Sequence, residues 1–259
     1  MEADRRLVAL VTGGSRGVGA ATALALADRG YDVLITYRNK VARASEVAND
    51  VLQRSVRALA VECDVTKHED RNRLFALFAK WSDHLDVLVL NASGGLERDL
   101  VAADPQYPMH INHDAQLALL DGAVPLMPHG ATVIFVTSHW AHRFGEVEQF
   151  PAYTPVAASK HAGEQALRRR QDGLTDQGIR LLVVTGDLIE GTITPKLLER
   201  GAPGSIEQRR AEVGSLPTTI DMGEAIAIAA TGTTLPSGHT VVVGGPLESL
   251  RPVAGNPER

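Results

Sequence analysis

Short runs of apolar residues recur along the chain, and a longer stretch of mixed apolar and polar residues follows each of them. An uninterrupted apolar run indicates a strand that is buried on both faces, as the strands of parallel sheets are. The mixed stretches have helical length, and the alternation is typical of a doubly wound parallel α/β sheet with helices on both faces. We predict strands at residues 7–11, 32–37, 56–61, 87–90, 132–137, 180–184 and 240–243.

Helices are expected between these strands, at residues 20–29, 40–54, 66–81, 107–127, 155–176 and 221–230. Thr66 and Glu69 have the spacing of a capping box, and Pro155 suits the first turn of its helix. Residues 188–216 are rich in Gly, Pro and Arg, so we expect an irregular lid over a substrate. The tail from Pro246 holds several prolines and is expected to be loosely ordered.

Composition narrows the class of protein. A chain of 259 residues with neither repeat nor linker suits one domain over residues 1–259. A net charge of −5 argues against nucleic-acid binding, and no apolar run has the length of a membrane span. The one cysteine, Cys63, excludes an internal disulfide, and the charged N-terminus lacks a signal-peptide core. We therefore expect a cytoplasmic protein.

A glycine-rich turn follows the first predicted strand and opens the first helix. Its glycines fall at Gly13, Gly17 and Gly19. Glycine permits a tight turn and lets a phosphate approach the backbone, and the helix behind it offers free N–H groups to a diphosphate. The spacing Gly-x-x-x-Gly-x-Gly after Thr12 resembles that of the short-chain dehydrogenase/reductase family. The resemblance extends from Leu7 to Gly245 and implies a Rossmann-type fold that binds a nicotinamide dinucleotide.

The end of the second strand indicates which dinucleotide is bound. An Asp or Glu at this position favours NAD, because a carboxylate binds the ribose 2′-OH. This chain has Tyr37 and Arg38 there, and Arg16 lies in the glycine-rich turn. Two guanidinium groups without a carboxylate favour a 2′-phosphate. We predict NADPH/NADP+ as the cofactor.

The resemblance places further residues at the cofactor. Asp64 and Val65 end the third strand, and Thr185-Gly186 stands where the family usually has Pro-Gly. The family usually reads Asn-Asn-Ala-Gly after the fourth strand, where this chain has Leu90-Asn91-Ala92-Ser93. The implied cofactor residues are Gly13, Ser15, Arg16, Gly17, Val18, Gly19, Tyr37, Arg38, Asp64, Val65, Asn91, Ala92, Ser93, Lys160, Gly186 and Thr192.

The catalytic residues of the family are Asn, Ser, Tyr and Lys, with the last two spaced as Tyr-x-x-x-Lys. Asn112, Ser138 and Lys160 match three of them, but Val156 stands where the tyrosine belongs. In the family that tyrosine gives the reduced carbonyl its proton, and the lysine lowers its pKa. The three matching residues keep the expected support for hydride transfer. The usual acid is missing, because valine has no acidic proton.

Several groups could replace the missing acid. Tyr153 lies nearby in sequence, although a helix starting at Pro155 would leave it in the preceding loop. His139 and His142 follow Ser138, and histidine can donate near neutral pH. Their spacing also suits a metal, but a third ligand is not evident, so no metal site is expected. We favour a hydroxyl of the substrate or a bound water as the proton source.

The sequence therefore predicts an NADPH-dependent ketoreductase. Trp140, Phe144 and Phe150 could contact a flat ring system, and the missing tyrosine makes the chain similar to atypical ketoreductases of angucyclinone antibiotic pathways, such as that of simocyclinone. The expected substrate is thus a ketone on a polycyclic aromatic polyketide. The alternatives are a non-catalytic NADP(H)-binding sensor or scaffold, and an elimination or epimerisation enzyme. The family resemblance implies a homodimer or tetramer.

Overall fold

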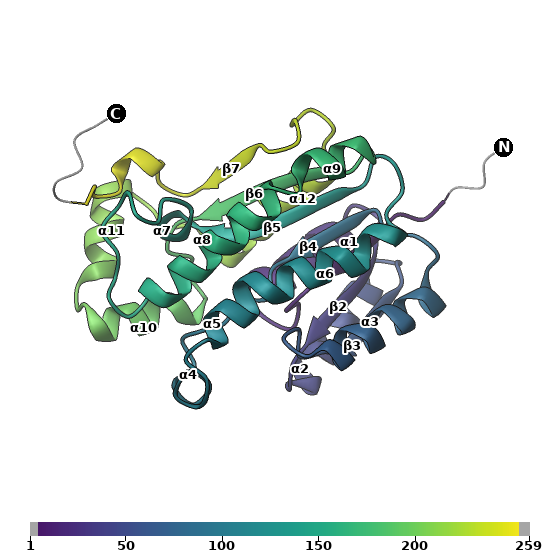
Figure 1. Cartoon of the computed structure of the whole chain (residues 1–259), viewed down its shortest axis with the longest axis horizontal. Helices are drawn as coiled ribbons and strands as arrows, with labels where there is room; N and C mark the ends of the chain where they lie inside the picture. The colour runs from purple at the N-terminus through teal and green to yellow at the C-terminus, as the bar shows by residue number, and fades with distance from the viewer. Residues whose placement is uncertain (1–4, 254–259) are drawn as a thin grey trace.

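The strands form one parallel sheet in the order β3-β2-β1-β4-β5-β6-β7 (Figure 1). The computed structural model describes residues 5–253. The paired strands all run parallel, and the order reverses at β1 and β4, which confirms the doubly wound class. The strands are β1 (Val8–Val11), β2 (Asp32–Tyr37), β3 (Ala58–Glu62), β4 (Val87–Leu90), β5 (Thr132–Ser138), β6 (Arg180–Gly186) and β7 (Thr240–Val243).

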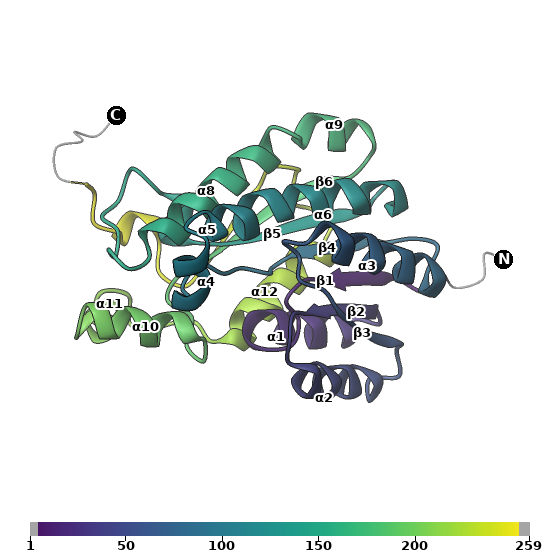
Figure 2. The ribbon, with the colours of Figure 1, turned by 60° about the horizontal axis from the view of Figure 1, so that its bottom comes forward.

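Helices cover both faces of the sheet, as predicted. On one face lie α1 (Gly17–Ala27), α2 (Val41–Leu52) and α12 (Thr219–Thr231), and on the other lie α3 (His68–Trp81), α6 (Ala115–Ala123) and α8 (Thr154–Arg168) (Figure 2). Alternate residues of β1 enter the two cores: Val8 and Leu10 pack on the side of α3 and α6, and Ala9 and Val11 on the side of α1 and α12. Within residues 5–253, no helix is both long and apolar enough to cross a bilayer.

The start of α3 differs from the prediction. The helix begins at His68, and its N-cap, Lys67, makes no side-chain cap bond. Instead, the Asp64 carboxylate accepts from the backbone N–H and hydroxyl of Thr66. The predicted capping box at Thr66 is therefore wrong, because the neighbouring carboxylate takes the hydroxyl.

Both long predicted helices are subdivided. The first consists of α5 (Tyr107–Met109), a π-helical turn (His110–Asp114), α6 and a 3₁₀ turn (Val124–Leu126). The second divides after Arg168, and α9 (Gln171–Asp176) follows it. Short helices α4 (Arg98–Ala103) and α7 (His139–His142) lie at the carboxyl end of the sheet.

The expectation that residues 188–216 are irregular is wrong. They contain α10 (Ile193–Gly201) and α11 (Ser205–Val213), which lie at the left of Figure 1 beside α7. Gly204 and Gly214 have φ of +86°, so they punctuate these helices at positions that favour glycine. A third core holds the segment together; its buried members are Trp140, Ala141, Val147, Tyr153, Val156, Ala157, Leu188, Leu198, Leu216 and Leu250.

The described part of the tail packs against the body. Leu250 belongs to the third core and is 6% exposed, after a 3₁₀ turn (Leu247–Ser249). The backbone N–H of Val253 donates to Glu146, and that of Glu148 donates to Arg251. The prediction of a loose tail is wrong for residues 246–253, and residues 254–259 lie outside the described residues.

Candidate active site

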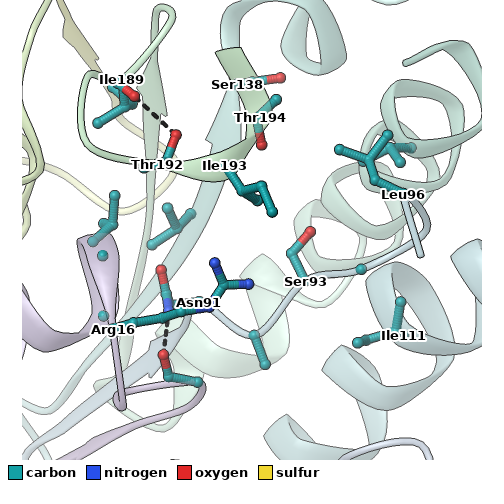
Figure 3. Close-up of a pocket in the computed structure, with 18 of the residues that line it drawn as sticks. Arg16, Asn91, Ser93, Leu96, Ile111, Ser138, Ile189, Thr192, Ile193 and Thr194 are labelled. Carbon is teal, nitrogen blue, oxygen red and sulfur yellow. Dashed lines mark hydrogen bonds between the residues drawn. The ribbon is translucent and has the colours of Figure 1, made fainter. Parts of the chain in front are cut away.

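A cavity of about 570 Å³ opens at the carboxyl ends of the strands. It runs past the end of β1, where the strand order reverses, which is where open α/β sheets bind their ligands. Every residue that the resemblance assigned to the cofactor lines this cavity, together with Ser138 and Tyr153. Figure 3 shows Arg16 extending into it from the glycine-rich turn, opposite Ser93 and Ile193.

The glycine-rich turn has the shape of a phosphate cradle. Gly13 and Gly17 have φ of +68° and +56°, in the left-handed region. At Gly19 a Cβ atom would overlap the Gly13 carbonyl oxygen and lie 2.5 Å from the Asn91 amide nitrogen. The residues present therefore fit a dinucleotide, because only glycine lets the turn close this tightly and bring its backbone N–H groups near a phosphate.

Thr12 fixes the turn to the neighbouring strand. Its hydroxyl donates to the carbonyl of Val89 at 3.1 Å and accepts from the backbone N–H groups of Asn91 and Ala92, each at 3.0 Å. The Asn91 side chain donates back to the Thr12 carbonyl at 2.9 Å. These bonds hold the ends of β1 and β4 at one fixed separation.

Arg38 lies at the adenosine end of the cavity and is already engaged. Its Nη1 donates to the Tyr107 hydroxyl at 2.6 Å, and its Nη2 lies 3.7 Å from the Glu97 carboxylate. Sequence reasoning missed Glu97 and Tyr107, because neither belongs to a motif. The nearby thiol of Cys63 has its pKa raised to about 12 by burial, so it is a thiol and not a nucleophile.

Ser138 and Lys160 lie where the sequence predicted them. Ser138 ends β5, and its Oγ accepts from the Ala141 N–H at the start of α7. Lys160 on α8 is 9% exposed, and its Nζ donates to the Val136 carbonyl at 2.9 Å. Burial lowers the pKa of Lys160 to about 8, while the Glu164 carboxylate opposes this shift.

Asn112 does not line the cavity. It is 2% exposed in the π-helical turn, and its Nδ2 donates to the Gly94 carbonyl and the Ser159 hydroxyl. Its Oδ1 accepts from the Ser93 hydroxyl at 2.8 Å. Asn112 thus connects the loop after β4 to α8 by hydrogen bonds, and it holds the cavity-lining Ser93 without lining the cavity itself.

Val156 fills the place of the usual acid with hydrocarbon. It is 3% exposed and lies in the third core. A Cβ at Gly95 would come within 3.0 Å of both Val156 Cγ2 and Pro108. The loop after β4 therefore packs closely on this side chain and leaves little space for a larger one.

Tyr153 lies one helical turn before Val156 in the sequence, and its side chain lines the cavity. Its backbone is helical (φ −100°, ψ −15°) at the N-cap of α8, and its hydroxyl lies 2.9 Å from Ser138 Oγ. Burial raises the pKa of Tyr153, and the hydrogen bond with Ser138 opposes this. The expectation that a helix start at Pro155 would separate Tyr153 from the site is wrong, since the helical path continues through it. Tyr153 and Lys160 lie seven residues apart and so share one helix face.

Neither candidate histidine lines the cavity. His139 is fully buried: its Nε2 donates to the Gly245 carbonyl, and its Nδ1 accepts from the Thr185 hydroxyl. Burial lowers its pKa to about 4. His142 pairs with the buried carboxylate of Glu164 at 2.9 Å. Both of these alternatives to the missing acid therefore lie outside the cavity lining. Among residues 5–253, no three metal-ligating side chains form a group.

One end of the cavity is mostly apolar. Its lining includes Leu96, Trp140, Val156, Leu188, Leu197 and Leu198. Of the three aromatic residues expected to contact a flat substrate, only Trp140 lines it; Phe150 packs on Trp140 at 5.2 Å between ring centroids, and Phe144 packs near His161.

The helices α10 and α11 are anchored through Arg209. This side chain is 3% exposed, binds the Asp187 carboxylate at 2.8 Å and lies over the Trp140 ring at 5.5 Å. The Asp187 carboxylate also accepts from the N–H groups of Leu188 and Gly245. Arg209 belongs to the stretch that the sequence predicted to be an irregular lid, and α11 buries it against the third core.

Comparison with known proteins agrees with this geometry. A chain from Streptomyces collinus named 1-cyclohexenylcarbonyl-CoA reductase is 30% identical over 73% of this chain and 66% of its own length. Hydroxynaphthalene reductase-like protein Arp2 of Metarhizium robertsii is 31% identical over 61% of this chain and 58% of its own. This chain thus aligns with somewhat less than two thirds of these relatives.

A solved structure supports the fold independently. The angucycline C-6 ketoreductase LanV with bound NADP superposes with a TM-score of 0.75 and 25% identity, over 93% of this chain and 96% of that one. The family model described as short chain dehydrogenase matches residues 7–200, from the first strand to the end of α10. With more than half of its length matched, the chain belongs to the short-chain dehydrogenase family.

Proposed function

We propose that this protein is an NADPH-dependent ketoreductase acting on a ketone of a polycyclic aromatic polyketide. The observation that carries the proposal is that Ser138, Lys160 and the glycine-rich turn line one cavity. Bound NADPH would supply the hydride. The Ser138 hydroxyl would donate to the carbonyl oxygen as negative charge develops on it, and the Lys160 ammonium would bind the ribose hydroxyls.

The choice of NADPH rests on Arg16 and Arg38. Both line the cavity, and a guanidinium binds phosphate through charge-assisted hydrogen bonds. The end of β2 carries no carboxylate that would accept from a ribose 2′-OH. Calorimetric titration tests this choice: NADPH should bind more tightly than NADH, and equal affinities would contradict it.

The proton comes, in this proposal, from a hydroxyl of the substrate or from water. Val156 has no proton, and Tyr153 is a poor source, because burial raises its pKa. In the family the lysine favours the tyrosinate, whereas here the Tyr153 hydroxyl lies 2.9 Å from the neutral Ser138 hydroxyl and the Lys160 Nζ donates to the Val136 carbonyl. A ketone beside its own phenol or enol hydroxyl can be protonated within the molecule as hydride arrives.

Tyr153 instead has a positioning role in this proposal. Ser138 Oγ has two acceptor sites and one hydrogen. The Ala141 N–H takes one acceptor site, and a hydrogen bond donated by Tyr153 takes the other. The hydrogen of Ser138 is then left to point at the carbonyl.

The substrate class rests on the cavity walls and on the relatives. Trp140 and the neighbouring leucines offer apolar surface to a flat ring system. Arp2 is named for a hydroxynaphthalene and LanV for an angucycline, both fused aromatic compounds. We extend that substrate class to this chain.

The test is NADPH consumption with a panel of ketones. Fused aromatic ketones with a hydroxyl next to the carbonyl should be reduced, and the same ketones with that hydroxyl methylated should react far more slowly. Equal rates would contradict donation by the substrate hydroxyl and leave water as the source.

The alternative is a non-catalytic NADP(H)-binding sensor. The burial of Val156 under the loop after β4 favours it, because the usual acid position is closed. Retention of Ser138 at the cavity argues against it, since a sensor needs no group that polarises a carbonyl. Turnover of any ketone excludes the sensor, whereas tight NADPH binding without turnover across the panel favours it.

A further inference from the structure

Arg38 joins the end of β2 to the segment after β4. It directly follows β2, whereas its partners Glu97 and Tyr107 follow β4, and β1 lies between these strands in the sheet. The contact therefore links two segments that flank β1, the strand at which the order reverses. Both Arg38 and Glu97 line the cavity.

The two partners of Arg38 hold it in different ways. The Tyr107 hydroxyl is a neutral acceptor for Nη1 at 2.6 Å on a ring that is 7% exposed, so its position is set by packing. Glu97 is charged and lies 3.7 Å from Nη2, which is an ion pair without a hydrogen bond. Because a guanidinium has five N–H donors, the bond to Tyr107 leaves Nη2 and Nε able to donate to a phosphate.

Glu97 is itself fixed in place. Its Oε2 accepts from the Gly95 N–H at 2.8 Å, so the carboxylate is tied to the loop after β4. A phosphate that binds Arg38 Nη2 has to approach the Glu97 carboxylate, and the two negative charges repel each other. The side chains of Arg38 and Glu97 are each more than a third exposed, so their ion pair is weak and a phosphate can replace it.

From this geometry we propose that Tyr107 and Glu97 determine the cofactor preference through Arg38. Tyr107 is a positioning residue that presents the guanidinium to a 2′-phosphate. Glu97 is a specificity-determining residue that competes with that phosphate and limits the affinity for NADPH. A ribose without the 2′-phosphate leaves the contact between Arg38 and Glu97 in place. The inference rests on the proposed use of NADPH, and concerns residues that no family motif includes.

The test measures dissociation constants of NADPH and NADH by calorimetry for the wild type and two variants. Tyr107→Phe should weaken NADPH binding by about three- to tenfold, the value of one hydrogen bond, and leave NADH binding unchanged. Glu97→Gln should strengthen NADPH binding by about two- to fivefold, the value of an exposed ion pair, and also leave NADH binding unchanged. The opposite changes in NADPH affinity distinguish the positioning role of Tyr107 from the competing role of Glu97.

Fragments and control variants locate the effect. The same changes should appear with 2′,5′-ADP and be absent with 5′-AMP, which differ by the 2′-phosphate. Tyr31→Phe removes the hydroxyl of another buried tyrosine, and Glu46→Gln removes an exposed charge on α2; both should leave all affinities unchanged.

The outcomes separate this inference from the proposed function. A wild type that prefers NADPH, with variants whose ratio of NADPH to NADH affinity is unchanged, overturns the inference and leaves the proposed function standing. Equal weakening of both cofactors by Tyr107→Phe shows a merely structural role for Tyr107. A wild type that binds NADH as tightly as NADPH overturns the proposed cofactor, and the inference with it.

Discussion

The two halves of the sheet hold their ligand-binding edges in different ways. In the cofactor half, from β3 to β4, short-range features fix the edge: the glycine-rich turn follows β1 directly, and Thr12 ties it to β4. In the substrate half, from β5 to β7, the edge is assembled from α7, α10, α11 and the segment around Leu250. These are distant in sequence, and the pair of Arg209 with Asp187 joins them. The cofactor half thus depends on backbone shape, and the substrate half on long-range packing.

The largest expected effect concerns the anchor of the substrate half. Arg209→Ala leaves the fully buried Asp187 carboxylate without its partner. Breaking a buried pair costs about 3–5 kcal/mol of unfolding free energy, which denaturant titration measures. The neighbouring exposed Arg210→Ala is the control and should change stability far less. The double variant Asp187→Asn, Arg209→Met should recover part of the loss, and a loss that stays complete contradicts the role of the pair.

A substitution in the cofactor half should damage binding. Gly19→Ala places a methyl group against the Gly13 carbonyl and the Asn91 amide, so the turn has to shift. We expect NADPH affinity to fall by about 10- to 100-fold, the value of one hydrogen bond from the turn to a charged phosphate. Gly173→Ala, where a Cβ meets only open space, is the matched control. Unchanged affinity in Gly19→Ala would show that the turn does not hold the cofactor.

Raising the pH should weaken cofactor binding through Lys160, which lies on α8 in the substrate half. Because the folded-state pKa of Lys160 is lowered to about 8, its ammonium is lost at a lower pH than that of an exposed lysine. NADPH binding should therefore weaken as the pH rises through about 8, and Lys160→Met should bind weakly with a flat profile. Since the unfolded chain keeps this proton to higher pH, the Lys160 contribution to stability increases over the same range. A profile shared by wild type and Lys160→Met would refute the assignment.

The smallest expected effect is that of Tyr153→Phe, and comparison with Ser138→Ala distinguishes a positioning residue from a group that polarises the carbonyl. Tyr153→Phe removes one neutral hydrogen bond to Ser138, worth about 0.5–1.5 kcal/mol, so kcat should fall by no more than about tenfold. Ser138→Ala removes the group that polarises the carbonyl and should lower kcat by about 100-fold or more. Complete loss of turnover in a folded Tyr153→Phe that still binds NADPH would make Tyr153 the proton donor.

The sequence predicted the cofactor half well because its signals are local. Apolar runs such as Val87–Leu90 mark buried strands, and the glycines after β1 mark a phosphate turn within a few residues. The substrate half carried weaker local signals. The glycines that bound α10 and α11 (Gly201, Gly204 and Gly214) favoured an irregular loop, and the role of Arg209 depends on Asp187, which lies 22 residues earlier.

The position of Tyr153 had a local signal in the sequence. The seven-residue interval from Tyr153 to Lys160 is two helical turns, which alone predicts a shared face. The proline at position 155 obscured this, although proline is compatible with a first turn that Tyr153 precedes. The contact of Arg38 with Glu97 and Tyr107 had no such signal, since it depends on how the loop after β4 folds back.

The packing around Val156 has a consequence for engineering the site. A Cβ on Gly95 would lie only 3.0 Å from Val156 Cγ2 and from Pro108, so there is little free volume on the side of Val156 that faces this loop. The side chain also lines the cavity. A phenol ring introduced by Val156→Tyr would therefore have to extend into the cavity, where it would occupy volume that is otherwise free for a ligand.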